Sequence, residues 1–166
     1  MSAETITTAL FLITAVVASA VLINAVYPVI QNMAGTFSSS THESDVRIRT
    51  DFKIIATSAT ESAGTAQVWM KNIGSERISL SEIQRSDVFC GKVGNFDHLT
   101  FTNNIPGDKQ WTADFGPGYD LNANGFWDSG ETLKVTAKTS VSSGDRIYFQ
   151  FALPSGIWRS NEFTAS

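Results

Sequence analysis

Hydrophobic positions dominate one uninterrupted segment near the N-terminus. Residues 6–30, ITTALFLITAVVASAVLINAVYPVI, contain no charged side chain and are mostly aliphatic. Residues 9–30 would form an α-helix about 33 Å long, against about 30 Å for the hydrocarbon core of a bilayer. The pattern therefore predicts a helix that is long enough to cross a membrane.

Three interpretations of this segment compete. It could be a cleaved secretory signal, because Ala18-Ser19-Ala20 resembles a small-residue cleavage site. Against this, no Lys or Arg precedes the apolar run, which continues for ten residues past that site. It could also be a solitary membrane anchor, or a helix that both anchors the chain and packs within a filament. The remainder of the chain favours the third interpretation.

The helical segment carries five candidate assembly residues, Glu4, Ala15, Ser19, Asn24 and Pro28. Glu4 either suits the positive end of the helix dipole or acts as a carboxylate at a subunit interface. Small residues allow helices to approach closely, and an amide can form hydrogen bonds between helices in an apolar medium. Proline removes one backbone hydrogen bond and is expected to kink the helix.

The hydrophobic period changes from helical to strand-like at Val46. Apolar and charged residues then alternate to residue 54, as in a half-buried strand. Between the two patterns, residues 35–45 are small and polar and are expected to form a hinge or a frayed helix end. The expected organisation is a helix over residues 1–34, this connection, and a β domain over residues 46–166.

Short strand-like runs separated by turn residues fill the C-terminal region. They cover residues 66–71, 77–83, 87–89, 98–102, 110–115, 132–139, 146–153 and 157–163. No amphipathic helix separates them, which favours an antiparallel β-sandwich of immunoglobulin-like size. The predicted fold class is α+β, with a long apolar helix followed by this sandwich.

Charge and reactive side chains narrow the functional classes. The net charge is −4 and all 12 Lys and Arg residues lie beyond residue 46, so the sequence offers no basic stripe for nucleic acid. Cys90 is the single cysteine, and its apolar neighbours indicate a core thiol. His42 and His98 have no nucleophile arranged beside them in sequence, so we expect no enzymatic activity.

One local motif has the spacing of a twelve-position calcium loop. Oxygen side chains occupy positions 1, 3, 5, 9 and 12, glycine occupies position 6, and a backbone carbonyl is expected at position 7. The candidate ligands are Asp120, Asn122, Asn124, Phe126, Asp128 and Glu131. The loop lies between strands, so its alternative is a turn braced by its own hydrogen bonds. With three anionic ligands, a structural Ca²⁺ site would be weak, on the order of 10⁻⁴ to 10⁻³ M.

Taken in order, ETITTALFLITAVVASAVLINAVYPVI, GTFSSSTHESDVRIRTDFKII and VWMKNIGS resemble the FlaG (ArlG) type of archaellum accessory protein. The chain is more distantly similar to archaellins and type IV pilins, and the resemblance covers essentially its whole length. It implies a helix in the cytoplasmic membrane and a β-sandwich outside, facing the surface layer in the pseudoperiplasm. It further implies a stationary motor component that polymerises and pairs with a FlaF-type partner.

The chain departs from archaellins and pilins at its start. Their precursors carry a short basic leader before the apolar helix, whereas this sequence begins MSAETITT. We therefore expect no processing by the prepilin peptidase, and Glu4 corresponds only loosely to the pilin glutamate. The alternatives to the stator role are an archaellin- or pilin-like filament subunit and a membrane-tethered recognition module.

Overall fold

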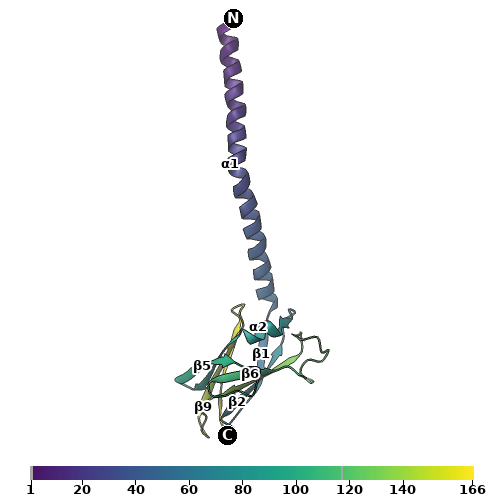
Figure 1. Cartoon of the computed structure of the whole chain (residues 1–166), viewed down its shortest axis with the longest axis vertical. Helices are drawn as coiled ribbons and strands as arrows, with labels where there is room; N and C mark the ends of the chain where they lie inside the picture. The colour runs from purple at the N-terminus through teal and green to yellow at the C-terminus, as the bar shows by residue number, and fades with distance from the viewer. Residues whose placement is uncertain (1, 117) are drawn as a thin grey trace. The chain divides into compact units, whose positions relative to one another are not determined.

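The computed structural model describes residues 2–116 and 118–166. It begins with one helix, α1 (Ser2–Arg49), 48 residues long, and continues into a β domain (Figure 1). Internal contacts divide the chain into two compact units that meet between Asp45 and Val46. A long apolar helix followed by a mostly antiparallel β domain is the predicted fold class, which is confirmed.

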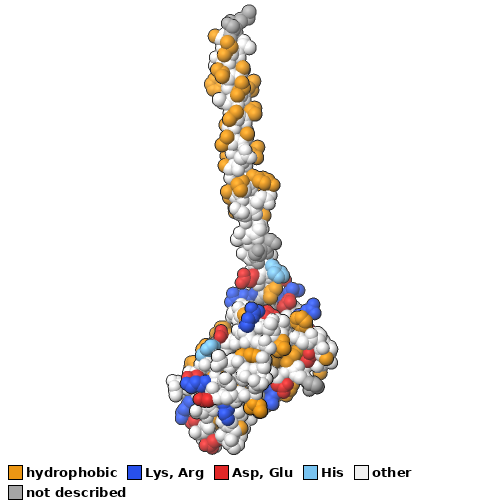
Figure 2. All heavy atoms as spheres, viewed as in Figure 1, with side chains coloured by type: hydrophobic (Ala, Val, Ile, Leu, Met, Phe, Trp, Pro, Cys, Tyr) orange, Lys and Arg blue, Asp and Glu red, His pale blue; other side chains and the backbone are white. Residues whose placement is uncertain are grey.

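The apolar side chains of helix α1 point outward all around the helix, and no other part of its unit covers them. Figure 2 shows hydrophobic side chains along much of its length, and large residues such as Phe11 and Leu22 are 70% and 64% exposed. It is long and apolar enough to cross a membrane, and no residue of its most apolar stretch is buried within the protein. A helix that is hydrophobic all round belongs in lipid or among other helices.

The structure shows a helix end over residues 35–45, one of the two expected alternatives, and corrects the expected start of the first strand. Residues 35–45 are helical, and the helix continues to Arg49 instead of changing to a strand at Val46. The alternation from Val46 also fits a last helical turn, in which the amide and hydroxyl of Thr50 both donate to the Val46 carbonyl. Basic residues in this turn suit the negative end of the helix dipole.

A turn of the β domain caps the end of α1. The amides of Ser75 and Glu76 donate to the Arg49 carbonyl at 2.9 and 3.1 Å, which satisfies an acceptor that a helix end leaves free. The turn approaches so closely that a Cβ on Gly74 would lie 2.3 Å from the Arg49 carbonyl oxygen. Only glycine fits this position.

The β domain contains ten strands and one short helix among the described residues. They are β1 (Phe52–Thr60), β2 (Thr65–Asn72), β3 (Ile78–Ser79), α2 (Leu80–Gln84), β4 (Asp87–Lys92), β5 (Asn95–Phe101), β6 (Gln110–Asp114), β7 (Phe126–Trp127), β8 (Thr132–Lys138), β9 (Arg146–Ala152) and β10 (Trp158–Thr164). The hydrogen-bonded order is β1-β2-β8-β6-β5-β4-β9-β10, and β3 pairs separately with β7. All these pairs are antiparallel except β5 with β6.

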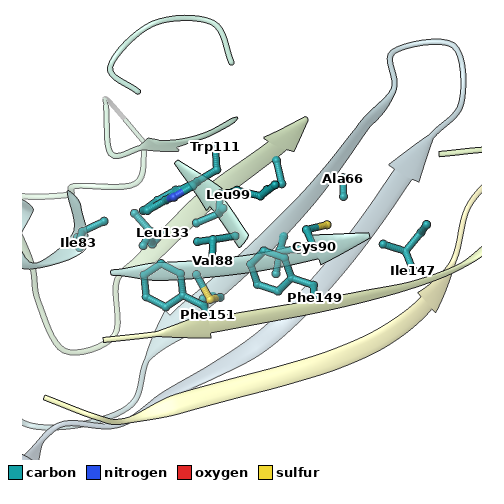
Figure 3. Packing of buried hydrophobic residues seen from close by; sticks show 14 of the residues in the cluster. Ala66, Ile83, Val88, Cys90, Leu99, Trp111, Leu133, Ile147, Phe149 and Phe151 are labelled. Carbon is teal, nitrogen blue, oxygen red and sulfur yellow. The ribbon is translucent and has the colours of Figure 1, made fainter. Parts of the chain in front are cut away.

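The buried side chains come from both halves of this long sheet. The ring of Phe151 on β9 packs edge-on against Phe52 on β1 at 5.6 Å and against Trp111 on β6 at 5.9 Å. Figure 3 shows the cluster between the strands. Contacts between distant strands of one sheet mean that the sheet folds over a common core, as in a sandwich.

The strand predicted over residues 77–83 is wrong in its second half. Only Ile78 and Ser79 are extended, and α2 follows. Ser79 caps α2 through a reciprocal capping box, in which the Glu82 carboxylate accepts from the Ser79 amide at 2.9 Å. A capping box satisfies two free amides at a helix start, which outweighs the strand-like alternation here.

Asn72 joins the end of β2 to two neighbouring segments. Its side chain is fully buried, and its Nδ2 donates to the carbonyls of Glu76 and Trp127 at 2.9 and 2.8 Å. Its Oδ1 accepts from the Gly74 amide at 3.0 Å. One amide therefore satisfies three backbone groups.

We predict that Asn72→Ala lowers the free energy of unfolding by about 2–4 kcal/mol, because it leaves buried backbone groups without partners. The measurement is denaturant unfolding of the full chain in nonionic detergent, followed by tryptophan fluorescence. Asn95→Ala, at an exposed position, is the control and should cost less than about 0.5 kcal/mol. Equal effects of the two substitutions would contradict the role of Asn72.

Candidate functional site

The predicted calcium loop folds around its own backbone amides. The two carboxylate oxygens of Asp120 accept from the amides of Asn124 at 3.3 Å and Gly125 at 2.9 Å. The side-chain oxygen of Asn122 accepts from the Asn124 amide, and that of Asn124 accepts from the Phe126 amide. These short-range bonds are those of successive Asx turns.

Glu131 closes the loop from its last position. It is only 4% exposed, and its two carboxylate oxygens accept from the amides of Leu121 and Asp128, both at 2.9 Å. Its backbone carbonyl accepts from the buried indole of Trp127 at 2.9 Å. Because β7 pairs with β3, the closing end of the loop is fixed to the core.

Two amides converge on Asp128 at the centre of the loop. The Nδ2 groups of Asn122 and Asn124 donate to the same oxygen, Asp128 Oδ2, at 2.8 and 2.7 Å. These hydrogen bonds, Asn122 first, hold the pKa of the Asp128 carboxyl below its ordinary value, with a smaller contribution from the charge of Arg77. The ionised form of Asp128 is therefore the one that the loop favours.

The donor atoms suit a hard cation only in part. The carboxylates of Asp120, Asp128 and Glu131 and two amide oxygens are the ligand types that Ca²⁺ uses. With the exception of Asp128 Oδ1, every oxygen of these carboxylates already accepts at least one hydrogen bond. The side-chain amides of Asn122 and Asn124 point their nitrogen, not their oxygen, at Asp128. Cation binding would require both amides to turn. Within residues 2–116 and 118–166, no cluster of three or more His, Cys, Asp or Glu side chains is arranged for a metal.

The candidate assembly residues lie along α1, all with exposed side chains. Ser19 lies one turn after Ala15, and its hydroxyl donates to the Ala15 carbonyl at 2.8 Å. The serine is therefore satisfied within its own helix, and the pair presents a small, smooth surface of the small-xxx-small kind. Asn24 lies elsewhere on the helix, Pro28 lies inside it, and Glu4 lies in its first turn.

The reactive side chains do not form a catalytic arrangement in the described part of the chain. His98 Nε2 lies 2.9 Å from Asp87 Oδ1 on the protein surface, without a nucleophile in the pair. Burial raises the pKa of the Cys90 thiol to about 12, so that this fully buried cysteine stays protonated and unreactive. Cys90 is a core residue, as its apolar neighbours in the sequence indicate.

Sequence reasoning missed the β3–β7 ribbon and the indole that fixes the loop. Phe126 and Trp127 are two adjacent aromatic residues, a residue type that is enriched in strands. Pairing between residues 78–79 and 126–127 is long-range, so no local pattern indicates it.

Comparisons with known proteins identify the relatives of this fold. The sequence model of the archaeal-type flagellin family matches residues 2–163. An uncharacterized protein from Archaeoglobus fulgidus is 29% identical over 168 residues, which covers 98% of each chain.

Three solved structures are similar, at identities that show a shared fold. The archaellum periplasmic stator protein FlaG from Sulfolobus acidocaldarius has a TM-score of 0.54 and 23% identity, covering 69% of this chain and 99% of that chain. The FlaF and FlaG stator complex from the same organism has a TM-score of 0.53 and 21% identity, covering 68% and 87%. The archaeal flagellum of Methanospirillum hungatei strain JF1 has a TM-score of 0.54 and 15% identity, covering 91% and 90%. These similarities confirm the resemblance seen in the sequence.

The geometry at Asp128 generates a prediction for its titration. Replacing both amides, in Asn122→Ala with Asn124→Ala, should raise the pKa of Asp128 toward its ordinary value, because the two donors are lost. In the wild-type chain the depressed pKa stabilises the loop above the ordinary carboxyl pKa, and this contribution disappears as the pH falls through the folded-state value.

The measurement is an NMR titration of the side-chain carboxyl of Asp128 in the full chain without added Ca²⁺. Asp145 is the internal control, because Lys92, not an amide, chiefly lowers its pKa. Its titration should stay unchanged in the double variant. An unchanged titration of Asp128 would contradict the role of the two amides.

Proposed function

Because the chain belongs to the archaeal-type flagellin family, we propose that this archaellum-related structural protein is a FlaG-type, membrane-anchored stator component. In this proposal α1 lies in the cytoplasmic membrane and the β domain faces the cell surface. The β domain pairs with a FlaF-type partner and faces the surface layer. The role is mechanical and involves no catalysis.

The observation that carries this proposal is the apolar surface of α1. Its large side chains are exposed around the whole helix, and each would gain about 1.5–3 kcal/mol from complete transfer out of water. A lipid bilayer or a bundle of like helices removes that surface from water. Residues 9–30 match the bilayer thickness, and the remaining helix to Arg49 would extend roughly 28 Å further at 1.5 Å per residue.

The β domain shares its fold with a known archaellum accessory protein. The similarity to the Sulfolobus acidocaldarius stator protein covers 99% of that chain, although at 23% identity it supports the shared fold alone. The related FlaF and FlaG complex gives a precedent for a partner of similar construction. A component that resists rotation needs one attachment in the membrane and another outside it, and the two units offer both.

A filament subunit is the second candidate. The similarity to the Methanospirillum hungatei flagellum covers 91% of this chain, so it includes the helix as well as the β domain. In that role, α1 would pack within a central bundle of helices and leave the membrane after assembly. Both candidates require contacts between helices, which the two assemblies would form in different places.

Single cysteines in α1 distinguish these candidates, because buried Cys90 contributes little background. We predict that Ala15→Cys forms disulfide-linked oligomers on mild oxidation of native membranes, since Ala15 and Ser19 form the small surface. Val17→Cys, on the opposite side of the helix, is the matched control and should cross-link at least about fivefold less.

The cellular fraction that contains the cross-linked species decides the role. Membranes retaining motor components would support the stator, whereas sheared free filaments would support the filament subunit. Equal cross-linking at both positions would contradict the proposed helix surface. Recovery of the protein as a water-soluble monomer would overturn both roles.

We also propose that the loop from Asp120 to Glu131 binds Ca²⁺ weakly and stabilises the β domain. The support is the ligand spacing and the anionic donors, with Glu131 buried at the closing position. Binding would draw the loop carboxylates toward the cation, after the amides of Asn122 and Asn124 turn their oxygens inward.

The test is the thermal unfolding of the full chain in 10 mM Ca²⁺. For a dissociation constant of about 10⁻⁴ to 10⁻³ M, the expected stabilisation is about 1.4–2.7 kcal/mol. Asp120→Asn, which keeps an oxygen for the Gly125 amide, should lose most of it, and Asp114→Asn outside the loop should retain it. The same response to 10 mM Mg²⁺, or no response in the wild-type chain, would refute the site.

A further inference from the structure

Strand register brings four of the six lysines of the chain onto one outer sheet face. Lys71 on β2 lies directly opposite Lys53 on β1, and Lys134 on β8 is diagonal to Lys71 because it pairs with Trp69. Lys138 lies further along β8 on the same side, since it alternates with buried residues of that strand. We call Lys53, Lys71, Lys134 and Lys138 the lysine face.

These lysines lack the carboxylate partners that the other two possess. Lys92 pairs with Asp145 at 2.7 Å, and Lys109 pairs with Asp97 at 3.0 Å. In the part of the chain that the structure describes, the lysine face forms no ion pair. The ammonium of Lys134 lies 5.6 Å from the Trp69 ring centre, and that of Lys138 donates to the Ala63 carbonyl.

The arrangement is electrostatically unfavourable in the isolated chain. Residues opposite each other on antiparallel strands have Cβ atoms about 4.5–5.5 Å apart, and like charges there are destabilising. Strands β1, β2, β6 and β8 together contain a single carboxylate, that of Asp114. Asp114 lies opposite Lys134 in the β6–β8 register, but its carboxylate accepts from the Gly116 amide and forms no ion pair with that lysine. The rest of the chain has a net negative charge, whereas the charge of the lysine face is positive.

We propose that the lysine face is the docking surface for an acidic protein partner. Its outward neighbours, including Gln67, Thr132 and Thr136, can form hydrogen bonds on a sheet surface, and the half-buried Trp69 lies among them. Carboxylates on the partner would satisfy charges that are unpaired here. Lysines are compact, strongly hydrated charges, so the contact should be fast, reversible and sensitive to salt.

A protein partner fits this face better than a lipid surface. Membrane-surface contacts usually combine basic residues with protruding apolar anchors, whereas these outward positions carry mainly hydroxyl, amide and ammonium groups. The inference applies whether the chain is a stator component or a filament subunit, because it concerns the β domain alone.

The test measures binding of fluorescent poly-L-glutamate to the full chain in nonionic detergent. The double variant Lys53→Gln with Lys71→Gln should weaken binding at least about fivefold in 50 mM NaCl. The control, Lys92→Gln with Lys109→Gln, removes the same formal charge and should change binding less than about twofold. Wild-type binding should fall at least about tenfold in 500 mM NaCl.

Thermal unfolding separates docking from a structural role. Lys53→Gln removes a like-charge contact, so it should raise the melting temperature by about 1–4 °C. A marked fall in melting temperature would mean that the lysine supports the fold, and it would overturn the proposal. The proposal also fails if wild-type protein does not bind poly-L-glutamate, if both double variants lose binding equally, or if polygalacturonate binds and poly-L-glutamate does not.

Discussion

The removal of α1 from water is the physical constraint on which the protein depends. The net stability of a folded domain is about 5–15 kcal/mol. Moving ten large apolar side chains out of water, at about 1 kcal/mol each for their exposed parts, would release a free energy of similar size. Side chains such as Phe11 and Leu22 cannot be buried within their own unit. The helix is compatible with a bilayer or with neighbouring helices, either of which would remove this surface from water.

The β domain holds the last turn of α1 through backbone hydrogen bonds and an ion pair. The Arg49 carbonyl accepts two backbone amides, and its guanidinium lies 2.9 Å from the Glu76 carboxylate. The same turn is fixed to the core by the buried side chain of Asn72. These contacts fix the Arg49 end of the helix to the end of β2 within the β unit. The helical residues 35–45 agree with the helix end that the sequence offered as the alternative to a hinge.

The predictable features are those with local physical causes. The apolar composition of residues 9–30 predicts the first part of α1, and the spacing from Asp120 to Glu131 predicts a loop whose members come together. The extension to Arg49 was missed because its small polar residues resemble a linker. Helix α2 was missed although Ser79 and Glu82 have capping-box spacing, and that spacing is the signal that could have identified it. The lysine face depends on the pairing of β1, β2 and β8, which no local pattern contains.

The helix is suited to attachment and the β domain to recognition of a partner. Neither unit alone could do both. An apolar helix can hold the chain in lipid, but its smooth surface gives little specificity beyond close packing at small residues. A folded β domain can present fixed charges such as Lys53 and Lys71 at defined spacing, because their strands are pinned by a common core. In the proposed roles, anchoring would come from the hydrophobic effect, which is not directional. The choice and orientation of a partner would come from electrostatic complementarity on the sheet. The proposed stator role requires both properties in one chain, because such a component would have to stay in place while its neighbours exert force.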